Sequence, residues 1–353
     1  MKIIHTSDLH LDSPFSANFD KEHAAIRKRE LSDTLYRISN FALSEGAGAI
    51  IIAGDLFDST RISKRRAEAV FSVMREHADI SYYYLTGNHE RDGLLSSGAE
   101  VPENLFAFGE KWTYFEARDT VICGRTTLTD GMMNELIVPE GKNCIAVLHG
   151  SLTERPAGED TIGLSTLQGS GINYLALGHY HSYSAKEFNG GVAVYSGTPE
   201  GRGFDETGEC GIVLIDTDSL SHRFIPFAKR CVLSIEADIT DADSIASVRV
   251  ALESALVGIK SENIVRVELV GRRSPELIID TESLSERFGD KFFYLEVRDL
   301  SRPRISPLDY RFDKSFKGEF IRYIYESQDL SDEEKADIVK CGISALLGEE
   351  SEL

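Results

Sequence analysis

Residues 174–183 read YLALGHYHSY and place two histidines, His179 and His181, directly after an apolar run that ends in Gly178. The run has the length and composition of a buried strand. Two histidines behind a strand can be ordinary solvated side chains, or they can form half of a metal site. The rest of the chain has to decide between these two interpretations.

Four other stretches repeat this arrangement, in which an apolar run is followed by a glycine or polar residue and then by Asp, Asn or His. They are SDLH (7–10), GDLFD (54–58), GNHE (87–90) and LHG (148–150). Alternate residues of an extended strand point to the same side, so we expect Asp8 to pair with His10 and His179 with His181. Glycines let the backbone turn sharply beside them. We therefore expect carboxylate oxygens and imidazole nitrogens to converge on one point.

The residue types in these stretches predict a metal centre. Asp and Asn oxygens combined with imidazoles, without a thiolate, suit divalent ions such as Mn, Fe, Co, Ni or Zn. The candidates outnumber the ligands of one ion, which favours two ions that share a carboxylate. Such a pair can hold a bridging hydroxide nucleophile and clamp a phosphoryl group, and His89 is then free to stabilise or protonate the leaving oxygen. The candidate ligands are Asp8, His10, Asp55, Asn88, His149, His179 and His181.

The order of the expected elements predicts an α/β protein with more than one domain in its 353 residues. Helical patterns at 21–45 and 63–78 alternate with apolar strands, and a series of strands continues to about residue 228. A smaller β-α-β-α-β unit, a proline-containing linker and two helices at 315–326 and 332–347 follow. For the apolar stripe of the last helix, packing on its own chain is favoured over partner binding. The stripe consists of Ile338, Val339, Ile343, Leu346 and Leu347.

Charge and cysteine content restrict the class of protein. The net charge of -20 argues against a clamp that holds nucleic acid through a basic surface, although phosphate held through metal ions remains compatible with it. The five cysteines have no paired spacing, which favours reduced thiols and a cytoplasmic location. The sequence contains neither an apolar run long enough for a membrane span nor a signal-peptide pattern, so we expect no membrane association.

The ordered motifs D-x-H, G-D-x-x-D, G-N-H-E, H-G and G-H-x-H resemble those of the calcineurin-like metallophosphoesterase superfamily over roughly residues 1–228. The resemblance implies a four-layer sandwich of two mixed β-sheets flanked by helices. It also implies two divalent metal ions, with manganese as the expected metal. One ion would be held by Asp8, His10 and His181 and the other by Asn88, His149 and His179, with Asp55 bridging and His89 as the catalytic histidine. The two histidines of the opening stretch would then serve different ions.

The stretches KIIHTSDLHLDSPF (2–15) and YSGTPEGRGFDE (195–206) resemble SbcD-type DNA repair exonucleases more narrowly. This resemblance implies a nuclease domain at 1–228, an α/β capping domain at 229–305 and a C-terminal linker with helices at 306–353. It further implies exonuclease or endonuclease cleavage of DNA, a homodimer and an SMC-like ATPase partner. One alternative is a phosphoesterase that acts on nucleotides or other small phosphoesters. A second alternative is a non-enzymatic subunit that assembles with an ATPase.

Two residues depart from the pattern of these nucleases. Asp58 stands where a histidine commonly faces the substrate phosphate, and Glu90 stands where aspartate is usual. Asp58 and Arg202 are the candidate substrate-binding residues. Asp58 would repel a phosphate unless it is screened by metal or turned away, whereas Arg202 is a candidate phosphate contact. We interpret the basic residues Arg61 and 64–66 as a solvated helix face, and residues 27–29 as surface charge.

Overall fold

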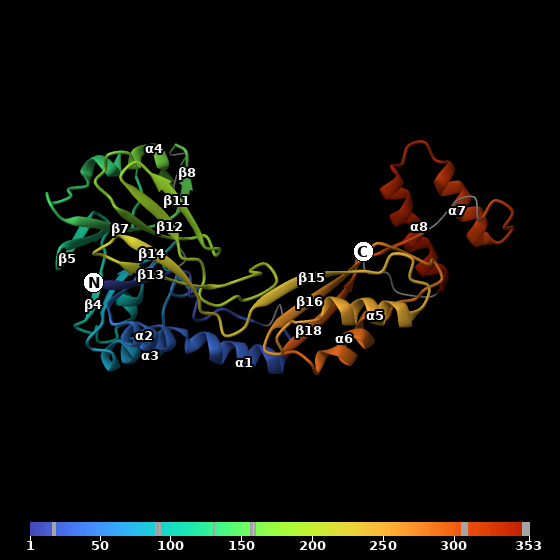
Figure 1. Cartoon of the computed structure of the whole chain (residues 1–353), viewed down its shortest axis with the longest axis horizontal. Coiled ribbons are helices and arrows are strands. Elements are labelled where there is room, and N and C mark those ends of the chain that lie inside the picture. Colours follow the sequence, from blue (N-terminus) through green and yellow to red (C-terminus); the bar gives the residue numbers. More distant parts are fainter. Residues whose placement is uncertain are drawn as a thin grey trace. The chain divides into compact units, whose positions relative to one another are not determined.

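The computed structural model describes residues 1–15, 19–88, 90, 93–129, 131–155, 158, 160–304 and 310–347. The chain separates into two compact units, Met1–Val232 and Leu233–Leu353, whose elements are labelled in Figure 1. Each unit has hydrophobic clusters of its own. The roles predicted for the parts of the chain, nuclease domain and capping domain, stay predictions.

A six-stranded mixed sheet forms the first of two sheets in the first unit. The strands β1, β2, β3 and β4 run parallel to one another. At the other side of the sheet, β13 runs antiparallel to β1, and β14 runs antiparallel to β13. The strand order is β14-β13-β1-β2-β3-β4. The bounds are β1 (Lys2–Thr6), β2 (Ala47–Ala53), β3 (Ser81–Leu85), β4 (Leu105–Ala107), β13 (Gly211–Asp216) and β14 (Ser221–Pro226).

The second sheet also has six strands, in the order β11-β12-β10-β7-β6-β5. Its four central strands are parallel, and β11 and β5 are antiparallel edge strands. The bounds are β5 (Thr113–Ala117), β6 (Thr120–Gly124), β7 (Asn143–His149), β10 (Tyr174–Gly178), β11 (Ser184–Phe188) and β12 (Gly191–Tyr195). In the second sheet the parallel strands therefore occupy the centre, whereas in the first they run from the centre to the edge strand β4.

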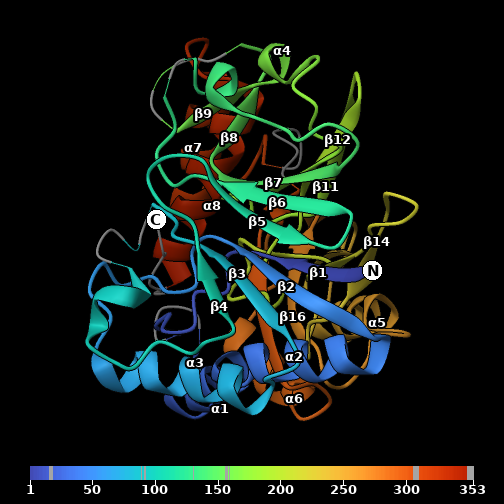
Figure 2. The same cartoon turned by 90° about the vertical axis from the view of Figure 1, so that its left-hand side faces the viewer.

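The two sheets pack face to face and are covered on their outer faces (Figure 2). Ile51 of the first sheet and Val147 of the second belong to the core between them. On the outer face of the first sheet, α2 (Thr34–Glu45) and α3 (Lys64–Glu76) bury Ile38 and Phe71. The second sheet is covered by short elements: η2 (Met132–Glu135), α4 (Leu164–Leu167) and the strands β8 (Ser151–Thr153) and β9 (Thr161–Gly163). The predicted sandwich of two mixed sheets flanked by helices is confirmed.

The helical pattern at 21–45 forms two helices instead of one. The first, α1 (Lys21–Ser32), is separated from α2 by the single residue Asp33, which caps both helices. Hydroxyl groups beside this break donate to backbone carbonyls, Ser32 to Lys28 and Thr34 to Glu30. Such bonds compete with the regular helix and bend it. The pattern at 63–78 forms the single helix α3, whose N-terminus is capped by Ser63.

The second unit contains the predicted β-α-β-α-β pattern. Its sheet has the order β15-β16-β18, and the helices pack on it through residues such as Leu252 and Leu284. The elements are β15 (Val232–Asp238), α5 (Ile245–Ala255), β16 (Ile264–Val270), α6 (Thr281–Gly289) and β18 (Tyr294–Asp299). A small parallel pair, β17 (Arg272–Arg273) and β19 (Arg302–Pro303), accompanies this sheet.

The two helices expected near the end of the chain are α7 (Phe316–Glu326) and α8 (Asp332–Leu347). Ser331 and Glu334 cap α8 reciprocally: the Ser331 hydroxyl accepts the Glu334 N–H, and the Glu334 carboxylate accepts the Ser331 N–H. Val339 and Ile343 pack against Ile321 of α7. For these two residues of the apolar stripe, the predicted packing against the same chain is therefore confirmed. The side chains of Leu346 and Leu347 lie outside the described residues. Within the described residues, every helix is too short or too polar to cross a bilayer.

Candidate metal centre

The candidate ligands follow the carboxyl ends of parallel strands in both sheets. Asp8 lies beyond β1, Asp55 beyond β2 and Asn88 beyond β3, whereas His149 is the last residue of β7. His179 and His181 lie beyond β10. Ligand sites of open α/β sheets lie at this end of the strands. The connections thus bring together residues that are far apart in the sequence.

Two groups of ionisable side chains lie close enough to hold a metal ion. Asp8, His10 and His181 each offer one atom within 4.8 Å of the other two, and so do Asp8, Asp55 and His149. Asp8 belongs to both groups, whereas the family resemblance predicts Asp55 as the bridging ligand. The identity of the bridging carboxylate stays a prediction.

The remaining two candidates adjoin the second group. The side-chain oxygen of Asn88 lies 3.0 Å from His149 Nε2, and the rings of His149 and His179 lie 5.4 Å apart. The backbone N–H of His179 also donates to the carboxylate of Asp8 at 3.1 Å. The structure therefore gathers all seven candidates around one centre, while their roles as ligands stay predictions.

The backbone brings Asp8 and His10 together in a way that strand alternation does not. The strand β1 ends at Thr6, and Asp8 and His10 have φ angles of 51° and 46°. Asp55 has a φ of 51°, and His179, beyond the end of β10, has a φ of 105°. The prediction that these side chains meet as alternate residues of an extended strand is therefore wrong. Left-handed turns aim them, a conformation that is uncommon outside glycine and concentrates at functional sites.

Glycines make room for the approach of the ligands. A Cβ atom on Gly87 would lie 2.0 Å from Asp55 Oδ1, and one on Gly54 would lie 2.2 Å from His149 Nδ1. Both positions are closed to any larger residue unless a ligand moves. The close approach of these side chains thus explains why the GDLFD and GNHE motifs have glycine at these two positions.

Three of the histidines have Nδ1 close to an oxygen atom of the protein. The Nδ1 atom of His10 lies 2.5 Å from Asp58 Oδ1, that of His181 lies 2.7 Å from Glu206 Oε1, and that of His149 donates to the Ala53 carbonyl at 2.9 Å. The Nε2 atoms face the other candidates, and those of His10 and His181 lie 3.3 Å apart. Metal-binding histidines are held in this manner, so the side chains fit a divalent ion.

The electrostatics at His149 also favour a cation. Burial lowers the pKa of this imidazole, but the carboxylates of Asp55 and Asp8 outweigh burial and raise the pKa to about 9. Asp8 is fully buried and Asp55 is 2% exposed, so water screens their charges little. A positive charge is therefore stabilised at this point of the fold.

Glu206 is the main residue of the centre that the sequence interpretation missed. Its carboxylate contacts His181 and also accepts from the guanidinium of Arg202 at 2.6 Å. Burial opposes the charged carboxylate, but the hydrogen bonds from His181 and Arg202 outweigh it and lower the pKa of Glu206 to about 2. The signal in the sequence is an acid four residues after Arg202, at the end of the stretch 195–206.

The two predicted substrate contacts, Asp58 and Arg202, are engaged with other groups of the protein. Asp58 contacts His10 and accepts a hydrogen bond from the Ser13 hydroxyl, and Arg202 donates to Ser13 at 2.9 Å. Burial opposes ionisation of Asp58, yet His10, Ser13 and Arg202 hold the pKa of this carboxyl well below its usual range. Contact of either side chain with a substrate stays a prediction.

His89, the predicted catalytic histidine, lies outside the described residues, and its role stays a prediction. Glu90 is fully buried, and its carboxylate accepts hydrogen bonds from the Phe57 N–H and the Tyr84 hydroxyl. Burial raises the pKa of Glu90 to about 8. This departure from the family pattern therefore ties the GNHE stretch to the GDLFD stretch.

Arg27 contradicts its interpretation as surface charge, because its side chain is fully buried. It donates to Glu30 at 2.6 Å, to Glu200 at 3.0 Å and to the carbonyl of Gly201 at 2.9 Å. Glu200 and Gly201 belong to the stretch that also carries Arg202 and Glu206. Arg27 thus anchors this stretch to α1.

The basic residues that follow the GDLFD stretch lie near the start of α3. Lys64 and Arg65 are exposed, as expected for a solvated helix face. Arg66 is exposed as well, and its guanidinium pairs with Asp12 at 2.8 Å. The solvated interpretation is confirmed for Lys64 and Arg65, whereas the guanidinium of Arg66 is engaged with Asp12.

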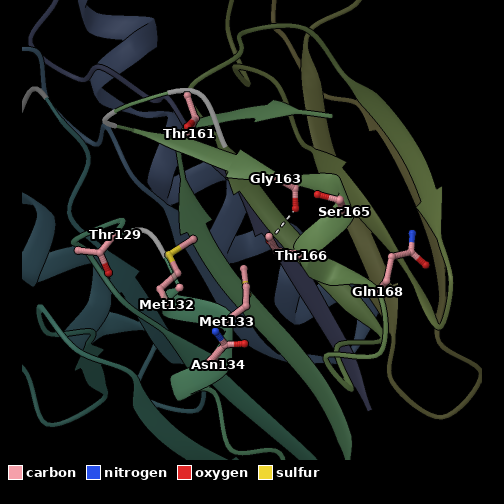
Figure 3. Close-up of a pocket in the computed structure, with 10 residues that line it drawn as sticks. Thr129, Met132, Met133, Asn134, Thr161, Gly163, Ser165, Thr166 and Gln168 are labelled. Atoms are coloured by element: carbon pink, nitrogen blue, oxygen red, sulfur yellow. Dashed lines mark hydrogen bonds between the residues drawn. The ribbon is translucent and has the colours of Figure 1, made fainter. Parts of the chain in front are cut away.

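A separate pocket of about 280 Å³ lies beside η2 and α4 (Figure 3). Its lining includes Met132, Asn134, Ser165 and Gln168, and the Thr166 hydroxyl donates to the carbonyl of Gly163 at 2.7 Å. Among the described residues, the lining contains neither a charged side chain nor a candidate ligand. This pocket therefore does not supply the charges that a phosphate site needs.

Residues 1–183 match the calcineurin-like phosphoesterase family. Among curated proteins, the uncharacterized metallophosphoesterase YhaO of Bacillus subtilis (strain 168) is 27% identical over 305 residues, covering 79% of this chain and 74% of YhaO. The DNA double-strand break repair protein Mre11 of Sulfurisphaera tokodaii is 26% identical over 239 residues, covering 61% of this chain and 59% of that protein. The chain thus spans less than two thirds of this Mre11. The solved structure of TT1561 from Thermus thermophilus matches with a TM-score of 0.41 at 14% identity, covering 64% of this chain and 98% of that one.

Proposed function

The chain belongs to the calcineurin-like phosphoesterase family, and from this premise we propose that it is a metal-dependent phosphodiesterase that cleaves DNA. The observation that carries the hydrolase part is the convergence of Asp8, Asp55 and the Nε2 atoms of His10, His149 and His181. The similarity to Mre11 of Sulfurisphaera tokodaii, a DNA double-strand break repair protein, supports DNA as the substrate.

Two divalent ions, with manganese as the first choice, would be held by the seven candidates. One ion would be bound by Asp8, His10 and His181. The other would be bound by Asn88, His149 and His179. Asp55 would bind both ions. Divalent ions, when bound, supply Lewis-acid stabilisation of the charge on a phosphoryl group and acidify a water molecule for attack.

The exposure of the candidates suggests the side from which a substrate approaches. Asp8, His10 and Asp55 are at most 2% exposed and form the floor of the centre. Asn88 is exposed, and the His181 side chain is 31% exposed. A phosphodiester would reach the centre from the side of Asn88 and His181. His89 would protonate the leaving oxygen.

A second candidate function is hydrolysis of nucleotides or other small phosphoesters. Two observations favour it: the net charge of -20 and the engagement of Arg202 with Glu206 and Ser13. Both reduce the positive charge available for a nucleic-acid backbone. A small substrate needs the metal centre alone.

We further propose an SMC-like ATPase as partner, a homodimer, and a capping role for the β-α-β-α-β part of the second unit. The exposed aromatic side chains near α7 support a protein partner. Phe312, Phe316 and Tyr323 are 84%, 71% and 75% exposed. Phe316 and Tyr323 are seven residues apart on α7 and therefore share one face. Exposed aromatic clusters of this kind mark interaction sites.

The test compares two substrates with Mn²⁺ as the metal: end-labelled linear duplex DNA and bis-p-nitrophenyl phosphate. We expect the protein to cleave both, and we expect Asp55→Ala to lose both activities while keeping its fold by circular dichroism. Cleavage of the small diester with intact DNA, both alone and with an ATPase partner, would contradict the DNA proposal and favour the alternative. No turnover of either substrate would contradict the hydrolase assignment.

A further inference from the structure

We infer that the two metal positions are unequal, because the carboxylates of Asp58 and Glu206 support the histidines of one position only. Asp58 and Glu206, together with Arg202, are positioning residues that make the Asp8–His10–His181 position the tighter of the two and the first to fill. The inference rests on the two-metal assignment proposed above and concerns metal affinity, independently of the substrate.

The first support is at His10. Its Nδ1 lies 2.5 Å from Asp58 Oδ1, and the imidazole is 2% exposed. Asp58 is itself fixed, because the Ser13 hydroxyl donates to its carboxylate and its backbone N–H donates to Asp12 at 2.6 Å. The fixed carboxylate therefore lies beside Nδ1, and Nε2 of the same ring faces His181.

The second support is at His181, where Nδ1 lies 2.7 Å from Glu206 Oε1. The Glu206 side chain is 4% exposed, and Arg202 binds it through two nitrogens, at 2.6 Å and 3.0 Å. Arg202 also lies 3.5 Å from Asp58. One guanidinium therefore joins the two carboxylates behind the two histidines.

The histidines of the other position have different surroundings. The Nδ1 atom of His149 donates to the neutral carbonyl of Ala53 at 2.9 Å. The ring of His179 lies edge-on to the rings of His149 and Tyr180, at 5.4 Å and 5.3 Å between centroids. Apart from the candidate ligands Asn88 and Asp55, which lie 3.0 Å and 3.4 Å from His149 Nε2, the described contacts of these two rings are with a neutral carbonyl and with aromatic rings.

The physical consequence is a difference in ligand strength. A carboxylate that accepts the Nδ1–H, as Glu206 does for His181, fixes the tautomer and makes Nε2 a more basic ligand, more strongly than a neutral carbonyl because the hydrogen bond is charge-assisted. Asp58, whose carboxylate lies 2.5 Å from His10 Nδ1, adds a negative charge beside that ring. Asp58 and Glu206 together carry two negative charges, and Arg202 balances one. The remaining negative charge lies behind His10 and His181 and stabilises a cation there.

The test titrates Mn²⁺ into the metal-free full chain by isothermal titration calorimetry. We expect two phases for the unmodified protein. Asp58→Ala and Glu206→Ala should each weaken the tighter phase by roughly 10–100-fold and leave the weaker phase unchanged. Asp58→Asn and Glu206→Gln should weaken it less, because each amide keeps the shape of the side chain and an oxygen beside Nδ1 while the charge is lost.

The matched control is Asp205→Asn. Asp205 is exposed and adjacent to Glu206 in the sequence, so the variant removes the same charge without touching a contact to His181. Both of its phases should equal those of the unmodified protein. Thermal unfolding without metal identifies variants that do not fold, and the amide variants, which keep the shape of the side chains, then decide the question.

Each other outcome has a distinct meaning. Two equal phases in the unmodified protein, or equal weakening of both phases by Asp58→Ala and Glu206→Ala, would overturn the inference. Unchanged Mn²⁺ affinities in these variants would also overturn the inference, but the two-metal assignment would survive. Failure of the unmodified protein to bind Mn²⁺ would overturn the two-metal assignment itself and the inference with it.

Discussion

Replacement of Arg27 by methionine should destabilise the first unit by about 3 kcal/mol. Removal of one partner from a buried ion pair costs about 3–5 kcal/mol, because it leaves an uncompensated buried charge. Arg27 is fully buried and serves two carboxylates, Glu30 at 2.6 Å and Glu200 at 3.0 Å. Each carboxylate keeps a second arginine, Arg230 for Glu30 and Arg37 for Glu200, so the lower end of the range applies.

Urea unfolding followed by the fluorescence of Trp112 measures this loss, because Trp112 is the one tryptophan of the chain and lies in the first unit. A loss of about 3 kcal/mol lowers the midpoint by roughly 1–3 M urea. The stability of Arg27→Lys should lie between those of the unmodified protein and Arg27→Met. An ammonium keeps the positive charge but lacks the planar guanidinium that reaches several acceptors. The control Lys28→Met changes an exposed neighbour and should stay within about 0.5 kcal/mol. If Arg27→Met costs as little as the control, the buried network does not stabilise the unit.

Three further outcomes follow from the same contacts. Gly87→Ala should lower Mn²⁺ affinity in calorimetry, because its Cβ would lie 2.0 Å from Asp55 Oδ1, whereas Gly289→Ala, which has nothing within 4 Å, should not. Burial opposes ionisation of Glu30, but hydrogen bonds from Arg230 and Arg27 outweigh it and lower the pKa of this carboxyl from 4.5 to about 2. Glu30 therefore contributes about 3 kcal/mol at neutral pH, and this contribution is lost as the pH falls from about 4.5 to about 2. The stability difference between the protein and Glu30→Gln in urea should shrink over that window, and a constant difference would contradict the assignment. Burial raises the pKa of Glu90 from 4.5 to about 8, so ionisation is disfavoured in the folded state and Glu90→Gln should gain stability relative to the unmodified protein as the pH rises between these values. Equal pH profiles in metal-free urea unfolding would contradict that reasoning.

The strand-end motifs carried enough information to predict the architecture and the gathering of the candidate ligands. Apolar runs of strand length predicted the strands of the two sheets. The polar residues that follow these runs lie at strand ends, as Asp55 does after β2. The glycines were equally informative, because a Cβ on Gly54 or Gly87 would collide with a candidate ligand. These features are local in sequence, and local patterns can be recognised without the fold.

The features that the sequence did not reveal depend on partners far along the chain. Arg27 lies in a helix of mainly polar residues and looks like surface charge until Glu200, 173 residues away, is placed beside it. Glu206 acquires its role from His181, 25 residues earlier. The left-handed backbone at Asp8 and His10 is set by contacts as well, since their N–H groups donate to the carbonyls of Gly54 and Asp55. Residue type and spacing do not encode such pairings.

The central claim is that His179 and His181 serve different metal ions. The most direct measurement is a crystal structure of the Mn²⁺-loaded protein with an anomalous difference map at the manganese edge. We predict two peaks, one bonded to Asp8, His10 and His181 and the other to Asn88, His149 and His179, with Asp55 in contact with both. A single peak, or two peaks with His179 and His181 bound to the same ion, would contradict the account.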